Sequence, residues 1–273
     1  MGSRIAHRLL ASGHDLLVWN RDAAKAEPLV EAGAHEVATP AEAAAEAEAV
    51  ITMVADPAAL RDVTEGPAGV AAGASDATVV QMSTVGTEAT ARLLSLLRAD
   101  MGLLDAPVLG SVAEAESGTL KIYAGGERSL VERWTPLLSS LGEVIHVGPV
   151  GAGSAAKLVA NATLVGVIGV LGEALALGQH LGLTQAATFE VLGTTALAQQ
   201  AGRRRDSVET GRYPPRFALS LARKDADLIL EAASGLDLRL MPAAQAWLRD
   251  AENAGLAGED YSAVLARILG PSA

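Results

Sequence analysis

The sequence predicts an α/β domain with a doubly wound, mostly parallel sheet, followed by an all-helical domain. The 273 residues suffice for about two domains. In the first half, short apolar runs of strand length alternate with helical patterns, as in βαβ units. From about Ser154 onward the pattern is helical and predicts no further strand. We therefore expect domains at residues 1–150 and 151–273.

The predicted elements of the first domain come from short apolar runs and helical segments. Residues 2–12 predict a helix because Ile5, Leu9 and Leu10 share one side. Residues 16–19 form a continuous apolar run, which is typical of a buried parallel strand. Further helices are predicted at 23–32 and 40–48, and further strands at 50–54, 79–82, 103–106, 120–124 and 144–147.

The second domain begins after the glycine-rich stretch 148–153 with a segment that is apolar nearly all round. Lys157, Asn161 and Glu173 interrupt this segment. The stretch between Asn161 and Glu173 is well short of the ~20 residues that a membrane span needs. We expect a helix buried in a helical domain or a dimer, and no membrane partner.

The composition excludes several classes of function. With no cysteine there is no disulfide framework, no cysteine-ligated zinc and no thiol nucleophile. A formal net charge of −11 argues against a nucleic-acid partner. The five histidines have no metal-binding spacing, so we expect no metal. No leader pattern precedes the first helix, which predicts a cytoplasmic protein.

Two glycine-rich stretches invite a nucleotide-binding interpretation. Residues 151–156 fit the dinucleotide fingerprint G-x-G-x-x-G/A, but the following helix does not return to a strand within ~30 residues, so we interpret them as a decoy. A phosphate-binding loop at 148–154 fails because Ser154 stands where lysine is required.

The start of the chain carries the better nucleotide signal. Gly2 opens a helix, and the next strand ends at Asn20 and Arg21, about 20 residues on, where a Rossmann unit reads the adenosine ribose. Asn with Arg in place of Asp or Glu favours a 2′-phosphate, and therefore NADPH over NADH. The preceding strand and first two glycines are absent, so we expect Met1 to be a start assigned too late.

Ordered motifs resemble one known family along essentially the whole chain. They are Met1-Gly2, the strand end Val18–Arg21, Met82–Val85, the loop Asp105–Ser111 continuing to Leu120, the stretch Gly151–Asn161 and the pair Lys224-Asp225. The chain resembles the β-hydroxyacid dehydrogenase family, of the 3-hydroxyisobutyrate dehydrogenase and glyoxylate/succinic semialdehyde reductase type, which is similar to 6-phosphogluconate dehydrogenase.

The resemblance implies an NADP-dependent oxidoreductase that interconverts a small aldehyde or carbonyl acid and its β-hydroxy acid. It implies a Rossmann-like domain and a homodimer or homotetramer. The residues implied at the cofactor are Gly2, Asn20, Arg21, Val54, Thr84 and Lys224, and those implied at the substrate are Ser83, Leu109, Gly110 and Ser111.

Lys157 and Asn161 are the predicted catalytic pair. Their spacing puts them on one helix face near the helix start. We expect burial and the positive helix end to lower the pKa of Lys157, which suits a general acid/base near neutral pH. Asn161 would orient the substrate.

Some features depart from the family pattern and leave alternatives open. Leu109 and Ser111 replace the usual serine and second glycine of the substrate loop, which predicts a different, larger or less polar substrate. An N-terminally incomplete, non-catalytic relative that binds a metabolite or partner is one alternative. An imine-reductase-like enzyme is another, although that class usually has Asp or Tyr where Lys157 stands.

Overall fold

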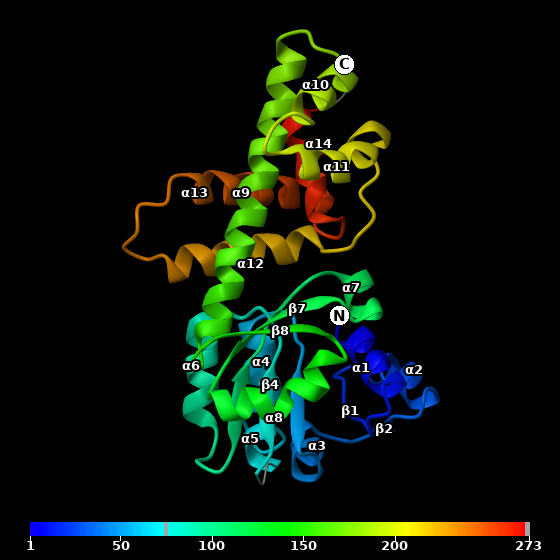
Figure 1. Ribbon diagram of the computed structural model, residues 1–273, viewed down its shortest axis with the longest axis vertical. Coiled ribbons are helices and arrows are strands. Elements are labelled where there is room, and N and C mark those ends of the chain that lie inside the picture. Colours follow the sequence, from blue (N-terminus) through cyan, green and yellow to red (C-terminus); the bar gives the residue numbers. More distant parts are fainter. Residues whose placement is uncertain (74–75, 271–273) are drawn as a thin grey trace. The chain divides into compact units, whose positions relative to one another are not determined.

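The computed structural model describes residues 1–73 and 76–270. The chain divides into two compact units, Met1–Leu158 and Val159–Ala273 (Figure 1). This division falls inside a long helix, and the predicted domain boundary between residues 150 and 151 stays a prediction. The last three residues of the predicted second domain, 271–273, lie outside the described residues.

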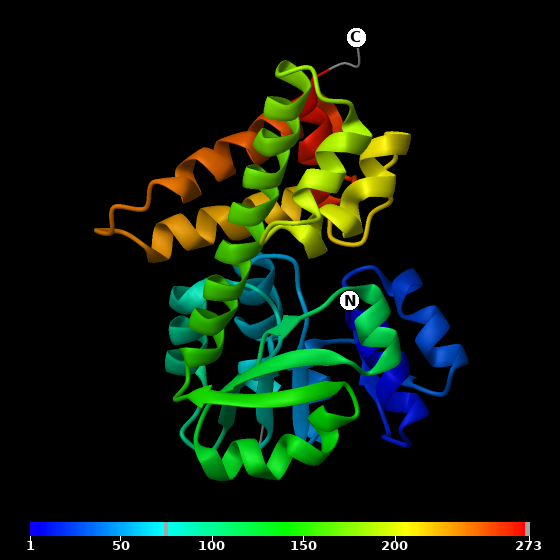
Figure 2. The ribbon, with the colours of Figure 1, turned by 45° about the horizontal axis from the view of Figure 1, so that its top comes forward.

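Unit 1 combines strands with short helices (Figures 1 and 2). Its strands are β1 (Leu17–Val18), β2 (His35–Glu36), β3 (Ala49–Thr52), β4 (Thr78–Gln81), β5 (Gly102–Asp105), β6 (Val108–Leu109), β7 (Leu120–Gly125) and β8 (Gly142–Gly148). Its helices are α1 (Gly2–Ala11), α2 (Glu27–Glu31), α3 (Pro40–Glu46), α4 (Pro57–Thr64), α5 (Val70–Gly73), α6 (Gly86–Leu96), α7 (Val112–Ser117) and α8 (Arg128–Ser139), with a 3-10 turn at Ala23–Lys25.

The strands form two sheets. β1 and β2 pair in parallel as a small sheet of their own. The larger sheet has the order β3-β4-β5-β7-β6, with β8 paired to β7, so β3 lies at its edge. The pairs β3–β4, β4–β5 and β7–β8 are parallel, whereas β7 runs antiparallel to β5 and β6. The predicted α/β class with a parallel-rich sheet is confirmed.

The continuous apolar runs arise because the larger sheet is covered on both faces. Neighbouring residues of a strand point to opposite faces, yet Val79 and Val80 of β4 are both 0% exposed. Val79 packs in a core with residues of α4 and α6. Val80 packs in a second core with residues of α1 and α8. A strand buried on both faces loses the alternation of polar and apolar residues.

Unit 2 is helical, which confirms the predicted class of the second domain. Among residues 159–270, strand-like pairing is limited to a single bridge between Ala218 and Asp260. The helices are α9 (Ala152–His180), which begins in unit 1, α10 (Gln185–Leu192), α11 (Ala198–Thr210), α12 (Leu219–Ala232), α13 (Leu240–Ala251) and α14 (Val264–Leu269), with shorter turns at Glu252–Leu256 and Tyr261–Ala263.

Helix α9 is long and apolar enough to cross a membrane by length and composition alone. Its mean hydropathy over the most apolar window is 1.8, and 44% of that window is buried in the protein. The core helix of a globular domain meets the same criterion. The criterion alone is therefore weak evidence for a membrane span.

Candidate active site

Lys157 and Asn161 lie one turn apart on α9, as their spacing predicts. Lys157 is 8% exposed and Asn161 is 2% exposed. The helix begins after Gly148 and Gly151, which adopt φ angles of +136° and +94° that side chains disfavour. These glycines therefore shape the turn into α9.

Gly153 lets the first turn of α9 approach the sheet closely. A Cβ atom added at Gly153 would lie 2.0 Å from the carbonyl oxygen of Asp105 and 2.5 Å from that of Tyr123. Asp105 ends β5, and Tyr123 lies within β7. The helix that carries Lys157 is thus packed directly against the backbone of two strands, and only glycine permits this separation.

Asp105 anchors the same helix turn through hydrogen bonds that the sequence did not reveal. One carboxylate oxygen accepts from the backbone N–H of Ser154 at 2.6 Å, and the other accepts from its hydroxyl at 2.7 Å. Burial raises the pKa of Asp105, which is 0% exposed, while the bonds from Ser154 and the Gly151 backbone act in the opposite direction. The sequence signals were a carboxylate at the end of a buried strand and its place at the start of the motif Asp105–Ser111.

In unit 2, Asn161 is joined to the predicted Lys224-Asp225 pair. Its Nδ2 donates to Oδ2 of Asp225 on α12 at 2.6 Å. Oδ1 of Asp225 lies 2.6 Å from Nζ of Lys224. Asp225 is 2% exposed; Lys224 supplies the opposite charge for its buried carboxylate, and the Asn161 amide supplies a hydrogen bond. The structure therefore brings Asn161 and Lys224 together through Asp225, a residue for which no role was predicted.

The predicted cofactor-side loop after β4 is held by an internal network. The Ser83 hydroxyl donates to the Thr52 carbonyl at 3.3 Å and accepts from the Val54 N–H at 2.8 Å. Gln81 bonds to both the N–H and the carbonyl of Ser83. Ser83 is 1% exposed. Its predicted substrate contact stays a prediction, and its hydroxyl would have to give up one of these bonds to make it.

Thr84 and Gly2 also remain predictions as cofactor contacts. Thr84, next to Ser83, is half-buried. Gly2 opens α1, as predicted, and an added Cβ there would lie 3.6 Å from Met53, which is an ordinary contact. The structure thus gives no steric reason for glycine at position 2.

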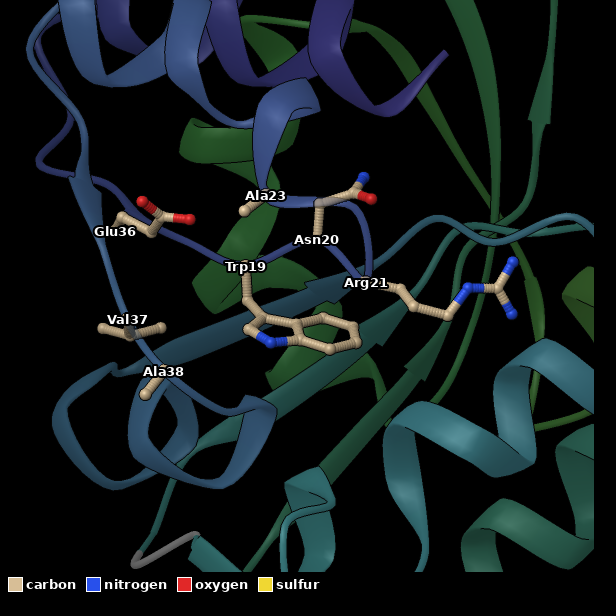
Figure 3. A pocket seen from close by; sticks show the side chains of 7 residues that line it. All are labelled: Trp19, Asn20, Arg21, Ala23, Glu36, Val37 and Ala38. Carbon is tan, nitrogen blue, oxygen red and sulfur yellow. The ribbon is translucent and has the colours of Figure 1, made fainter.

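Asn20 and Arg21 line an open pocket of about 540 Å³ at the carboxyl ends of β1 and β2 (Figure 3). The Asn20 side chain accepts from the Asp22 N–H at 3.0 Å and fixes the turn. Within residues 1–73 and 76–270, no carboxylate forms an ion pair with Arg21. Figure 3 shows the Arg21 side chain extending away from Glu36, the carboxylate on the β2 side of the pocket.

The predicted substrate loop links β6 to α7. Leu109 ends β6 and is half-buried. Gly110 has a φ of +142°, and an added Cβ would lie 2.6 Å from the Leu120 side chain. The backbone N–H and the hydroxyl of Ser111 both donate to Glu114, at 2.7 and 2.6 Å. Ser111 is therefore the N-cap of α7, and the S-x-x-E spacing was the signal that could have found it.

Metal ligands do not gather in the described part of the chain. Residues 1–73 and 76–270 contain no group of three or more His, Asp or Glu side chains placed to hold a metal ion. The ring of His146 instead lies 3.0 Å from the Gly126 carbonyl.

Two family models match successive parts of the chain. Residues 1–150 match the NAD binding domain of 6-phosphogluconate dehydrogenase. Residues 151–268 match the NAD-binding model of NADP-dependent 3-hydroxyisobutyrate dehydrogenase.

Individual relatives match along nearly the whole chain. 3-Sulfolactaldehyde reductase of Escherichia coli (strain K12) is 35% identical over 279 residues, which span 98% of this chain and 92% of that protein. Glyoxylate/succinic semialdehyde reductase 2 of Arabidopsis thaliana, a chloroplastic protein, is 34% identical over 97% of this chain and 76% of its own. The structure of Mycobacterium tuberculosis 3-hydroxyisobutyrate dehydrogenase with L-serine matches with a TM-score of 0.86 and 26% identity, covering 99% and 96% of the chains.

Proposed function

The chain belongs to the β-hydroxyacid dehydrogenase family of NAD(P)-dependent oxidoreductases, and from this premise we propose that it interconverts a small aldehyde or carbonyl acid and its β-hydroxy acid. The observation that carries the proposal is Lys157, a buried lysine in the second turn of α9. Its helix is fixed by Asp105 and lies against the strand backbone at Gly153.

In this mechanism Lys157 moves the proton. Nicotinamide, when bound, supplies the hydride. Lys157 donates a proton from Nζ to the carbonyl oxygen, which becomes the hydroxyl oxygen, and the lysine is left as a neutral amine. In the reverse direction the amine takes the hydroxyl proton. Asn161 orients the substrate oxygen, and Asp225 holds the Asn161 amide in place.

The residues at the end of β1 fit NADP better than NAD. Arg21 offers a planar cation without a carboxylate partner in the described chain, and Asn20 fixes the adjoining turn. Neither residue is the acid that would bind a free ribose hydroxyl and repel a 2′-phosphate. This supports the proposal that NADPH is preferred over NADH.

Substitution of Lys157 tests the function directly. We expect Lys157→Met to lower kcat by at least about a hundredfold for short aldehydes, because a general acid contributes ~10²–10⁴ in rate. NADPH binding, followed by nicotinamide fluorescence, should persist. Lys121→Met is the matched control, since Lys121 is half-exposed and paired with Glu143.

Two results would contradict the proposal. Wild-type turnover by Lys157→Met, measured as NADPH oxidation with glyoxylate or succinic semialdehyde, would remove the acid/base role. Failure of the unmodified chain to bind either nicotinamide cofactor would favour the non-catalytic alternative.

We also propose that the protein self-associates as a homodimer or homotetramer through α9. Val159, Val170 and Leu177 are 68%, 45% and 57% exposed. Their spacing places them on one side of the helix. Val170→Glu should lower the mass measured by light scattering if this side is an interface, and an unchanged mass would exclude it.

A further inference from the structure

A buried polar network extends the anchor of α9 to a third element. The hydroxyls of Ser154 and of Thr90, on α6, lie 2.9 Å apart. Because the Ser154 hydroxyl donates to Asp105, the Thr90 hydroxyl has one proton for two acceptors, the Ser154 hydroxyl and the Gly86 carbonyl at 3.1 Å. With Asp105, these side chains are at most 3% exposed. Three polar side chains are therefore packed together out of water within unit 1.

Stability alone does not call for such a cluster. Apolar groups of the same shape can replace a buried hydrogen-bonded pair at little or no cost in folding free energy. Unlike apolar contacts, hydrogen bonds are directional, because they require a narrow range of distance and angle between the groups that they join. The network therefore defines the position of the first turn of α9 more narrowly than apolar packing would.

The ends of the network lie beside the groups proposed to do the chemistry. Ser154 stands three residues before Lys157, so the two are neighbours on one helix surface. Thr90 lies in the second turn of α6, which begins at Gly86, directly after the cofactor-side loop at residues 83–85. The hydroxyl chain thus runs from the end of that loop to the helix of Lys157.

We propose that Asp105, Ser154 and Thr90 are positioning residues that hold Lys157 in register with the cofactor-side loop. The inference rests on the proposed function of Lys157. None of the three is assigned a contact with substrate or cofactor, because each acts through the helix turn that it anchors.

Two substitutions at Asp105 distinguish the effect of its hydrogen bonds on kcat from the effect of its charge. In Asp105→Asn, the new side chain has one oxygen to accept the Ser154 N–H and one amide to donate to the Ser154 hydroxyl. Ser154 can then donate to Thr90, and Thr90 to the Gly86 carbonyl. Asp105→Asn should therefore retain most of kcat, whereas Asp105→Ala should not. Equal losses in both variants would assign the effect to the charge and overturn the proposal.

Removal of single hydroxyls tests the rest of the network with little change of size. We expect Thr90→Val and Ser154→Ala to lower kcat about ten- to a hundredfold, with the KM for NADPH within about twofold of wild type. Thr64→Val is the matched control, because Thr64 is 2% exposed and its hydroxyl donates only to Leu60, within α4. The control should keep the wild-type kcat.

Amide hydrogen exchange gives a readout that does not depend on turnover. Loss of the anchor should speed exchange in the first two turns of α9 by about fivefold in Thr90→Val and Ser154→Ala, and not in Thr64→Val. If Thr90→Val and Ser154→Ala both keep the wild-type kcat and exchange rates while Lys157→Met is inactive, only the positioning role is overturned. An active Lys157→Met would overturn the proposed function itself.

Discussion

Gly153→Ala should disable the protein through one methyl group. The added Cβ would lie 2.0 Å from the Asp105 carbonyl oxygen and 2.5 Å from that of Tyr123. Both are backbone oxygens of strands at the centre of the larger sheet. Strand backbone cannot rotate out of the way as the end of a side chain can. The first turn of α9 must therefore move instead.

The size of this movement follows from the contact distance. Ordinary contacts begin at 3.4 Å, so the shortfall is 3.4 − 2.0 = 1.4 Å. A misplacement of about 1 Å in a catalytic group can cost ~10²-fold in rate. A hundredfold loss corresponds to about 2.7 kcal/mol of transition-state stabilisation. The better helix propensity of alanine, about 1 kcal/mol, acts on stability and does not restore the geometry.

The assay compares two glycine-to-alanine changes inside helices. Gly202→Ala in α11 is the control, because an added Cβ there meets no atom within 4 Å. It should keep the wild-type kcat/KM and raise the Tm by about 2–4 °C. Gly153→Ala should lose about a hundredfold in kcat/KM, measured by NADPH oxidation. Activity within twofold of wild type, with an unchanged Tm, would refute the reasoning.

Three further predictions concern cofactor, substrate and pH. Arg21→Ala should weaken NADPH binding about tenfold and leave NADH binding unchanged, because a charge-assisted hydrogen bond contributes ~1.5 kcal/mol; equal losses for both cofactors, or a similar loss in Lys25→Ala, would contradict it. Leu109→Ser should raise kcat/KM for short semialdehyde acids about fivefold by adding a hydrogen-bond donor. Equal activity of the variant and the wild type would contradict the prediction that Leu109 selects a larger or less polar substrate. Because burial raises the pKa of Asp105 above 3.8, the folded state binds this proton more tightly than the unfolded state. Its contribution to stability is therefore full below pH 3.8 and is lost as the pH rises through the folded-state pKa. As the pH rises from 3.8 through the folded-state pKa, the Tm of the wild type should fall relative to that of Asp105→Asn. A difference in Tm that does not change with pH would contradict this direction.

Much of the architecture could be predicted because burial leaves a periodic trace within each segment. The run at 79–82 predicts a buried strand, and β4 covers Thr78–Gln81. The helical pattern from Ser154 predicts α9 and places Lys157 and Asn161 one turn apart. These inferences need only the neighbours of a residue along the chain, because the geometry of a helix or strand determines which of them share a face.

The contacts between distant segments were decided only by the tertiary structure. Ser154 bonds to Asp105 across 49 residues, and Asn161 bonds to Asp225 across 64. The antiparallel run of β7 beside β5 and the internal use of the Ser83 hydroxyl likewise left no pattern in their own segments. Periodicity reports which face of a segment is buried, whereas the partner of a buried polar group depends on how separate elements pack and on which oxygen lies within hydrogen-bond distance. The sequence by itself therefore determined the elements and the candidate lysine, and the packing of β5, α6 and α9 determined what holds that lysine in place.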